Sequence, residues 1–376
     1  MRILMITAAF LLAMPITGFG WAEGSNLLLD PHLVCKKTRR LRGKHNDICK
    51  NETSLMKEIT KGINLGFKEC EYQFKNRRWN CTSHKKNIMR KVLIRDTRET
   101  SFVNAITAAG LTYAVTRACT MGNLVECSCD KNQRRQQYNN VNSNDIIIND
   151  MNNMKNMKNT KKRNKKLGKN FALPDGDWEW GGCGDNVHFG LRKSKEFLDS
   201  IRYKRRSDIK TLVKLHNNNA GRLAVKLFMR LECKCHGLSG SCTIRTCWMK
   251  MATFREIGNR LKDRFDGAVK VISRNDGNSF MPEGVTIKPP TRQDLVYTED
   301  SPDFCRSNHK TGSLGTYGRE CNATSQGVDG CDLLCCGRGY DHHIVQEKVN
   351  CKCSFKWCCD VTCSVCIENR EVNTCR

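Results

Sequence analysis

Beyond its first twenty residues, the 376-residue chain lacks an apolar run long enough to cross a bilayer. Residues 2–20 are the exception, because a charged start is followed by a short apolar run that Pro15 and Gly18 interrupt. This pattern is typical of a cleaved secretory signal peptide, here assigned to residues 1–22, and a membrane anchor is the alternative. We therefore expect a secreted protein with no transmembrane segment.

Acidic residues are also scarce, since 38 Asp and Glu stand against 64 Lys and Arg and give a formal charge of +26. Such a surplus favours an anionic partner. Secretion excludes nucleic acid and leaves the sulfated glycans of cell surfaces and matrix, heparan sulfate proteoglycans among them, as the natural candidates. The alternative is that scattered Lys and Arg only keep the protein soluble.

The histidines lack the spacing of zinc fingers, so the 24 cysteines do not predict metal sites. An even number of cysteines behind a signal peptide predicts a disulfide framework instead, and no cofactor is expected. Twelve cysteines precede residue 250 and twelve follow residue 300, as expected for two separately cross-linked domains. N-glycosylation sequons at Asn51, Asn80 and Asn322 agree with secretion.

Apolar residues recur at three- and four-residue steps in several stretches before residue 271, as in amphipathic helices. Asp208 is a plausible helix cap, and a bend is expected at 217–219. Residues 23–271 are therefore assigned to an N-terminal helical domain, with the apolar stripes as its core. The pattern predicts helices over about 53–74, 97–117, 186–203, 209–231 and 254–265.

Residues 131–170 interrupt this helical pattern. They contain eleven Lys or Arg against two Asp, many Asn and Met, and no sustained period. Such a composition cannot bury enough apolar area to offset the entropy of ordering, so a disordered basic insertion is predicted. It is either a tolerated surface insertion or a glycan-binding arm, and the small penalty of lengthening a surface loop favours the first.

Residues 272–292 are rich in Pro and Gly and are interpreted as a linker or hairpin region. Residues 293–376 carry twelve cysteines and little helical period, so disulfides rather than a large core must hold this C-terminal domain. Within it, residues 349–366 are predicted to form a long hairpin with Cys358 and Cys359 at its tip.

The densest pattern is Cys233-Lys-Cys-His-Gly-Leu-Ser-Gly-Ser-Cys-Thr-Ile-Arg-Thr-Cys-Trp248. The glycines between its inner two cysteines permit the backbone angles of a hairpin tip. If Cys235 pairs with Cys242 and Cys233 with Cys247, the tip becomes a rigid loop that displays Ser239. A small loop held rigid in this way indicates that its function is to present a residue to a partner.

This stretch resembles the signature of the Wnt family of secreted signalling proteins, and the resemblance covers nearly the whole chain. Within the family, residues 106–110 and 301–304 favour its sixth class. Five further motifs match: Arg78-Trp-Asn-Cys81, Trp180-Gly-Gly-Cys-Gly-Asp185, His216-Asn-Asn-Asn-Ala-Gly-Arg222, Ser301-Pro-Asp-Phe-Cys305 and Cys331-Asp-Leu-Leu-Cys-Cys-Gly-Arg-Gly339.

The family resemblance implies an α+β, disulfide-rich fold, with an N-terminal helical domain that carries a lipid-bearing hairpin and a C-terminal cystine-rich β-hairpin domain. It also implies most of the disulfide pairs, whereas a bond between Cys35 and Cys49 is expected from the sequence alone. The implied pairs are Cys70–Cys81, Cys119–Cys127, Cys129–Cys183, Cys305–Cys336, Cys321–Cys331, Cys335–Cys375, Cys351–Cys366, Cys353–Cys363 and, between neighbours, Cys358–Cys359.

The resemblance further implies a mechanism. Ser239 would receive a mono-unsaturated fatty acyl chain from an acyltransferase in the endoplasmic reticulum, and a carrier would accompany the lipidated ligand during export. The ligand would then grip the cysteine-rich domain of a Frizzled receptor and recruit an LDL-receptor-related co-receptor. The expected receptor contacts are Ser239, Phe355, Lys356, Trp357, Cys358 and Cys359.

Two other classes of function are weighed against this one. Gly237-Leu-Ser-Gly240 approaches the nucleophile elbow of a hydrolase but does not match it. The candidate bases His236, His342 and His343 have no identifiable carboxylate partner, so no enzyme is expected. A basic, cystine-rich matrix or glycan-binding protein is the remaining alternative.

Overall fold

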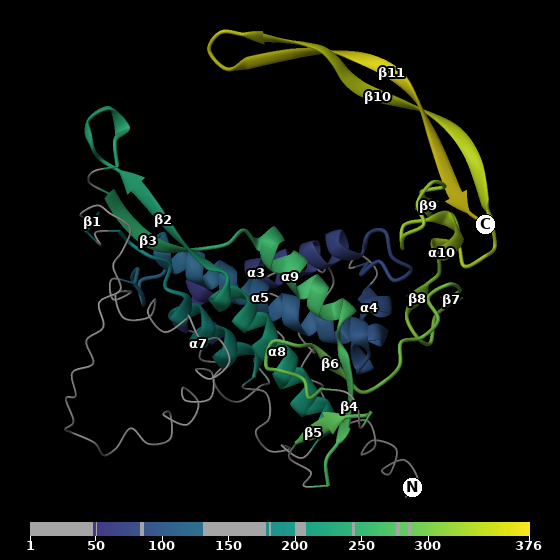
Figure 1. Ribbon diagram of the computed structural model, residues 1–376, viewed down its shortest axis with the longest axis horizontal. Helices are drawn as coiled ribbons and strands as arrows, with labels where there is room; N and C mark the ends of the chain where they lie inside the picture. Colours follow the sequence, from purple (N-terminus) through teal and green to yellow (C-terminus); the bar gives the residue numbers. More distant parts are fainter. Residues whose placement is uncertain are drawn as a thin grey trace, which may run out of the picture.

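The computed structural model describes residues 48–49, 51–82, 86–130, 178–179, 182–199, 208–242, 245–275, 279–284 and 288–376. They form a helical body from which two β-hairpins project, and a smaller β-rich part follows the body in the chain (Figure 1). The α+β, disulfide-rich class predicted from the sequence is confirmed. The signal peptide, Cys35 and the basic insertion at 131–170 lie outside the described residues.

Helix α5, Arg98–Thr120, is the centre of the body. Nearly all of its residues are buried, because other helices cover it from several sides. Its position explains why it lacks a polar face, unlike the amphipathic helices around it. Those packed on it are α3 (Thr53–Phe74), α4 (Lys86–Ile94), α7 (Val187–Leu198), α8 (Ile209–Leu227) and α9 (Phe254–Asp266).

Glycines allow the neighbouring helices to approach α5 closely. A Cβ atom on Gly62 of α3 would lie 2.5 Å from the carbonyl oxygen of Gly110 on α5. On α8, a Cβ atom on Gly221 would lie 1.9 Å from the carbonyl oxygen of Ala105. Only a residue without a side chain fits at these crossings.

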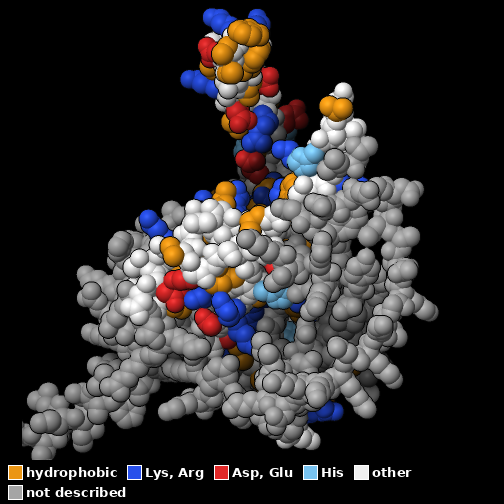
Figure 2. Space-filling view, turned by 90° about the vertical axis from the view of Figure 1, so that its left-hand side faces the viewer, with side chains coloured by type: hydrophobic (Ala, Val, Ile, Leu, Met, Phe, Trp, Pro, Cys, Tyr) orange, Lys and Arg blue, Asp and Glu red, His pale blue; other side chains and the backbone are white. Residues whose placement is uncertain are grey.

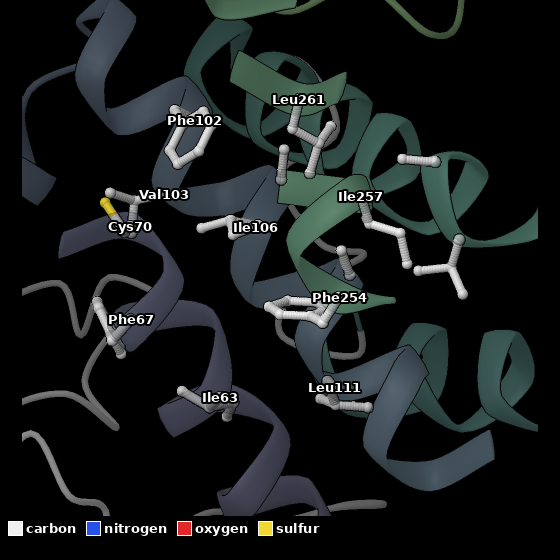
Figure 3. Packing of buried hydrophobic residues seen from close by; sticks show 14 of the residues in the cluster. Ile63, Phe67, Cys70, Phe102, Val103, Ile106, Leu111, Phe254, Ile257 and Leu261 are labelled. Atoms are coloured by element: carbon white, nitrogen blue, oxygen red, sulfur yellow. The ribbon is translucent and has the colours of Figure 1, made fainter. Parts of the chain in front are cut away.

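The apolar core forms where α3, α5 and α9 meet. Figure 3 shows side chains from the three helices, such as Phe67, Phe102 and Ile257, packed in one cluster. Phe74 makes edge-to-face contacts with Phe102 and Phe265 at centroid distances of 4.9 and 4.8 Å. Such contacts add about 0.5–1.5 kcal/mol per pair to the burial of the rings.

The asparagine run on α8 has a structural role in the body. Asn217 donates to the carbonyl oxygen of Val296 and accepts from its N–H, at 2.9 and 3.0 Å. Asn218 donates to Asp199 at 3.1 Å, and Arg222 pairs with the same carboxylate at 2.6 Å in a buried site. A bend was expected at 217–219, and these bonds explain why α8 continues through these residues as one helix.

The helix predictions are mostly close to the observed bounds. Asp208 caps α8 by accepting from the N–H of Lys210, as predicted, and Thr253 with Glu256 forms a capping box on α9. Helix α4 was not predicted. Among the helices of the described residues, none combines the length and apolarity that a membrane span needs.

The remaining strands form small sheets. Strand β6 pairs in parallel with β4, which also pairs with β5 within the predicted linker region. Leu295 and Phe304 belong to the helical core, so the start of the C-terminal part is packed on the body. The strands are β1 (Trp178–Glu179), β2 (Met229–Cys235), β3 (Arg245–Met251), β4 (Val269–Ser273), β5 (Phe280–Pro282), β6 (Val296–Tyr297), β7 (Ser307–Asn308), β8 (Ser313–Leu314), β9 (Glu320–Cys321), β10 (Tyr340–Lys356) and β11 (Asp360–Cys375).

The C-terminal part has little apolar core. Its buried cluster consists of Leu334 and three cysteines, around the short helix α10 (Cys331–Leu334). Arg319 joins it to the body by donating to the carbonyl oxygens of Arg78 and Lys75, at 2.8 and 2.9 Å. Disulfides therefore carry much of the stabilisation that apolar packing provides in the helical part.

Candidate functional site

Two hairpins project from the same side of the helical body (Figure 1). One consists of β2 and β3, and the other of β10 and β11, which arches over the body toward the first. Figure 2 shows the two projections side by side, with hydrophobic side chains gathered on the end of the taller one. Two rigid, separate tips on one side can hold a partner between them.

The β2–β3 hairpin is anchored at its base by Asp185. One carboxylate oxygen of Asp185 accepts from the N–H of Met251 at 2.8 Å, and the other accepts from the hydroxyl of Thr120 at 2.8 Å. The N–H of Asp185 in turn donates to the carbonyl oxygen of Met249. The hairpin is thus tied to α5 and stands on the helical core.

Two disulfides clamp the end of this hairpin. Cys233 is bonded to Cys247, directly opposite in the strand register, and Cys235 is bonded to Cys242. Between the inner two lies a single 3-10 turn, η6 (Leu238–Gly240). The predicted pairs and the predicted rigid loop are both present.

Ser239 lies at the apex of this loop in a left-handed conformation, with φ 56° and ψ 24°. The N–H groups of Gly237, Gly240 and Ser241 are satisfied within the loop, which fixes its backbone. Ser239 is exposed, and its hydroxyl makes no hydrogen bond to any described residue. It is therefore available for covalent modification.

The surroundings of Ser239 do not form a catalytic triad. The ring Nε2 of His236 contacts the hydroxyl of Thr246 at 2.9 Å instead of Ser239. His342 and His343 lie on β10, where they contact Asn373 and Thr374 of β11. A hydrolytic role for Ser239 thus lacks a base at the serine.

The β10–β11 hairpin is longer than residues 349–366, the predicted span. Cys351–Cys366 and Cys353–Cys363 cross-link its upper part, and Cys335–Cys375 ties its base to α10. At the tip, Phe355 and Trp357 are exposed, Trp357 to 94%. Val361, directly opposite Phe355, was missed from the sequence, although counting back across the turn would have placed it there.

Leu238 is a second exposed apolar residue that sequence reasoning missed. It is 94% exposed and immediately precedes Ser239 on a backbone that the disulfides hold. It places an apolar side chain beside the hydroxyl of Ser239 at the apex of the loop. Lys356 lies opposite Asp360, on the face of the hairpin that turns away from Phe355 and Val361.

The expected bond between Cys358 and Cys359 is not present: both are free and exposed. Both residues have left-handed backbones, with φ 73° and 82°, so the three-residue turn closes without a cross-link. Cys49 is disulfide-bonded, whereas Cys35 lies outside the described residues. The other pairs present are Cys70–Cys81, Cys119–Cys127, Cys129–Cys183, Cys305–Cys336 and Cys321–Cys331.

The three sequons differ in exposure. Asn51 and Asn322 are exposed, and Asn80 is half-buried. In the sequons of Asn80 and Asn322, the Thr hydroxyl donates to the Asn side-chain oxygen, at 2.5 and 2.9 Å. Their use as glycosylation sites stays a prediction.

Comparison with known proteins gives a consistent result. The model of the Wnt family matches residues 37–376. Human Wnt-6 is 47% identical over 96% of this chain and 94% of its own length, and mouse Wnt-6 is 48% identical over the same shares. A chain in the solved structure of human WLS in complex with WNT8A is similar with a TM-score of 0.59 and 33% identity, over 87% of this chain and 96% of that one.

Proposed function

The chain belongs to the Wnt family of secreted signalling ligands, and from this premise we propose that it binds a Frizzled-type receptor through its two projecting hairpins. In this proposal an acyl chain on Ser239 and the tip of β10–β11 contact opposite sides of the receptor's cysteine-rich domain. An LDL-receptor-related co-receptor binds at the same time. The protein acts by bridging the two receptors and has no enzymatic role.

The observation that carries the proposal is the pair of rigid tips on one side of the body (Figure 1). Each tip is cross-linked by two disulfides and exposes binding chemistry at its end. Preorganised contacts of this kind lose little conformational freedom on binding. This arrangement favours a receptor ligand over a matrix protein, which does not need paired tips.

The acyl chain on Ser239 is proposed to supply most of the affinity at the first tip. A buried methylene contributes about 0.8 kcal/mol, so roughly ten of them give about 8 kcal/mol before the costs of binding. Leu238 lies beside Ser239 and extends the apolar contact. A groove that accepts the chain would thus form a strong anchor.

The second tip contributes aromatic contacts. Phe355 and Val361 lie directly opposite each other, and Trp357 follows in the turn. Exposed aromatic residues on a fixed loop are frequent hot spots of protein interfaces. We expect them to enter an apolar depression on the receptor.

Export and retention follow from the same chemistry. An exposed acyl chain requires a carrier during export, and the similarity to WNT8A, which is found in complex with WLS, supports a carrier of that kind. A single acyl chain gives only marginal membrane binding. The surplus of 26 positive charges is proposed to add retention by heparan sulfate proteoglycans at cell surfaces and in the matrix.

The test compares Ser239→Ala with Ser241→Ala, a serine in the same disulfide-clamped loop. Both proteins are made in cells with the acyltransferase, and binding to an isolated Frizzled cysteine-rich domain is measured. Ser239→Ala should lose at least about a hundredfold in affinity, because the acyl contacts are absent, and Ser241→Ala should bind like the wild type. Equal binding by all three proteins would refute the lipid-based mechanism.

A further inference from the structure

Cysteines make up most of the small core of the C-terminal part. Two disulfides meet there, where β9, α10 and the end of β11 lie together (Figure 1): Cys321–Cys331 and Cys335–Cys375. Their sulfur atoms nearly touch, since the Sγ atoms of Cys335 and Cys321 are 3.6 Å apart. The Sγ atoms of Cys321, Cys335 and Cys375 all lie within 4.8 Å of one another. These four residues are named the sulfur cluster below.

The sulfur cluster does not suit a metal ion in this state. Zinc and similar ions bind cysteine as the thiolate, whereas each of these sulfur atoms is already bonded to a second sulfur. The chemistry open to neighbouring disulfides is exchange, in which a thiolate attacks one sulfur of a disulfide and displaces the other. Elsewhere in the described part of the chain, no three cysteines bring their sulfur atoms so close together.

The two disulfides of the cluster differ in how easily a reductant can reach them. Cys321 is half-buried, whereas Cys331, Cys335 and Cys375 are all buried, Cys335 completely. A reductant in solution should therefore attack the Cys321–Cys331 bond first, at the sulfur of Cys321. That bond links positions only ten residues apart, so its opening by itself frees a short loop.

The buried disulfide is the covalent tether of the β10–β11 hairpin. Cys375 is the last residue of β11, and its bond to Cys335 ties the base of the hairpin to α10. The base is also held by hydrogen bonds, such as those of the N–H and carbonyl groups of Cys375 with Arg319 and Gly318. The other cross-links of β11 lead only to β10. Loss of the tether thus leaves β11 without a covalent cross-link to the rest of the molecule.

We propose that the sulfur cluster is a thiol relay, in which reduction of the accessible Cys321–Cys331 bond opens the tether by exchange. An external dithiol attacks Cys321 and displaces the thiolate of Cys331, which takes up a proton. The second thiol of the reductant then releases the thiolate of Cys321 and leaves as a cyclic disulfide. The Cys321 thiolate attacks Cys335, the bond to Cys375 breaks, and Cys375 departs as a thiolate that is protonated in turn.

The overall reaction balances. The dithiol supplies two electrons and two protons and becomes a disulfide. The protein exchanges its two disulfides for a single Cys321–Cys335 bond, and Cys331 and Cys375 become free thiols. The tether is therefore opened although the reductant never reaches the buried sulfur of Cys335.

The geometry favours the exchange step. To form a bond, the Sγ atoms of Cys321 and Cys335 must approach from 3.6 Å to about 2 Å, a movement that side-chain rotation can supply. Two reactants that are held in contact react as if at very high concentration. Exchange inside the cluster should therefore be faster than attack by a second reductant molecule on Cys335, which is fully buried.

The consequence for signalling rests on the proposed function, in which the β10–β11 tip contacts the receptor. A hairpin without its tether no longer holds this tip at a fixed position, so the advantage of a preorganised contact is lost. A reducing exterior would thus weaken the ligand without cleaving its chain.

The first experiment uses the secreted full-length variant Cys331→Ser, in which a free Cys321 thiol faces the intact tether. The native protein is alkylated, and its free cysteines and disulfides are identified by peptide mass spectrometry. We expect a Cys321–Cys335 peptide and alkylated Cys375. Alkylation of Cys321 alone, with the tether intact, would overturn the relay.

Cys305→Ser is the matched control. It frees Cys336, which neighbours Cys335 in sequence but does not belong to the sulfur cluster. Alkylation should be confined to Cys336 and the exposed tip thiols, and Cys375 should be labelled at least about tenfold less than in Cys331→Ser, because no thiolate lies beside the tether. Equal labelling of Cys375 in both variants would mean that any free thiol scrambles this part, and would also overturn the relay.

The wild type provides a second test that does not depend on the secretion of a variant. The exposed thiols of Cys358 and Cys359 are first blocked with one alkylating reagent. The protein then receives less dithiothreitol than it has disulfides and is alkylated with a second, isotopically labelled reagent. The relay predicts the second label on Cys331 and Cys375 together. Label on Cys321 and Cys331 as a pair would contradict it.

Binding of the isolated Frizzled domain separates the relay from the function on which its consequence rests. After the reductant is removed, the exchanged wild type should bind that domain at least about tenfold more weakly than protein that was blocked but not reduced. Exchange without any loss of binding would overturn the regulatory role. If the untreated protein itself fails to bind, the receptor mechanism fails, while the labelling result still establishes the relay.

Discussion

The two hairpins project from the same side of the molecule but are stabilised in different ways. The β2–β3 hairpin stands on the helical core through Asp185, and residues at its base such as Met251 are buried. The β10–β11 hairpin is exposed along nearly its whole length, and among the described strands its one further partner is β9, at two residue pairs. An isolated two-stranded hairpin is at best marginally stable in water, so its cross-links replace the missing core.

A rigid binding tip can therefore be stabilised in two ways. In the helical body, close packing fixes the base of the hairpin and disulfides fix only its end. In the C-terminal part, disulfides fix both the base and the upper strands. The two parts should therefore respond differently to changes in packing, charge, reduction and pH.

The largest expected effect comes from Gly221→Ala in the helical body. The added Cβ would lie 1.9 Å from the carbonyl oxygen of Ala105, so α8 and α5 must separate. We expect a loss of about 4 kcal/mol or more in the free energy of unfolding, and very little secreted protein. Gly267→Ala is the control, because the nearest atom to its Cβ is 3.8 Å away, and its secretion should be normal.

Ion pairs in the two parts should also differ in how much they contribute to the free energy of unfolding. Arg222 and Asp199 are 3% and 6% exposed, whereas Arg370 of β11, which pairs with Glu347, is 53% exposed. Arg222→Ala leaves a buried carboxylate unpaired and should cost about 3–5 kcal/mol. Arg370→Ala should cost under about 1 kcal/mol. Similar values in chemical denaturation would contradict the difference in burial between the two sites.

Removal of a disulfide should destabilise the C-terminal part more than the helical body, the opposite of the order expected for the ion pairs. The double variant Cys335→Ser and Cys375→Ser opens a link across 40 residues, and Cys119→Ser with Cys127→Ser opens one across 8. Loop entropy predicts losses of about 4 and about 2.5 kcal/mol. Limited proteolysis should release the β10–β11 region in the first variant only, while helical circular dichroism persists. Equal resistance to proteolysis would mean that β10–β11 does not depend on this link.

The last predicted effect depends on pH and is confined to one buried carboxyl group, that of Asp96. Burial raises the pKa of Asp96 from 3.8 to about 6, against the attraction of Lys210, and one of its oxygens is buried without a hydrogen bond. The folded protein thus binds this proton more tightly than the unfolded chain. Asp96 therefore destabilises the fold progressively as pH rises from about 4 to 6, and the loss remains at neutral pH.

Asp96→Asn should remove this pH dependence. Relative to the wild type, the variant should gain up to about 3 kcal/mol between pH 4 and pH 7, since one pKa unit corresponds to about 1.4 kcal/mol. Thermal unfolding at several pH values measures the difference. Asp263→Asn, at an exposed position on α9, serves as the control and should change nothing. A constant difference across this range would contradict a buried, titrating Asp96.

The sequence predicted much of the helical body because its signals are local. Apolar spacing placed α3 and α9 within a few residues of their bounds, and Asp208 marked the start of α8. It missed α4, which spans only nine residues. A bend was expected at the asparagine run of α8, because the partners of these side chains, Val296 and Asp199, are distant in sequence and local patterns do not reveal them.

The site shows the same division between local and distant signals. The clamp around Ser239 was predicted because four cysteines fall in one short stretch. The length of β10–β11 was underestimated, since strands exposed on both faces lack the alternation of a half-buried strand. The bond expected between Cys358 and Cys359 came from family resemblance, whereas the turn closes through left-handed backbone at both residues.

The most direct test of the central claim is mass spectrometry of the peptide that contains Ser239, prepared from the secreted protein. The family resemblance implies a mono-unsaturated acyl group on Ser239, and the exposed hydroxyl on a fixed backbone agrees with it, so the group is predicted there and on no other residue of 236–241. An unmodified Ser239 in efficiently secreted, active protein would contradict the account, and receptor binding would then rest on the β10–β11 tip alone.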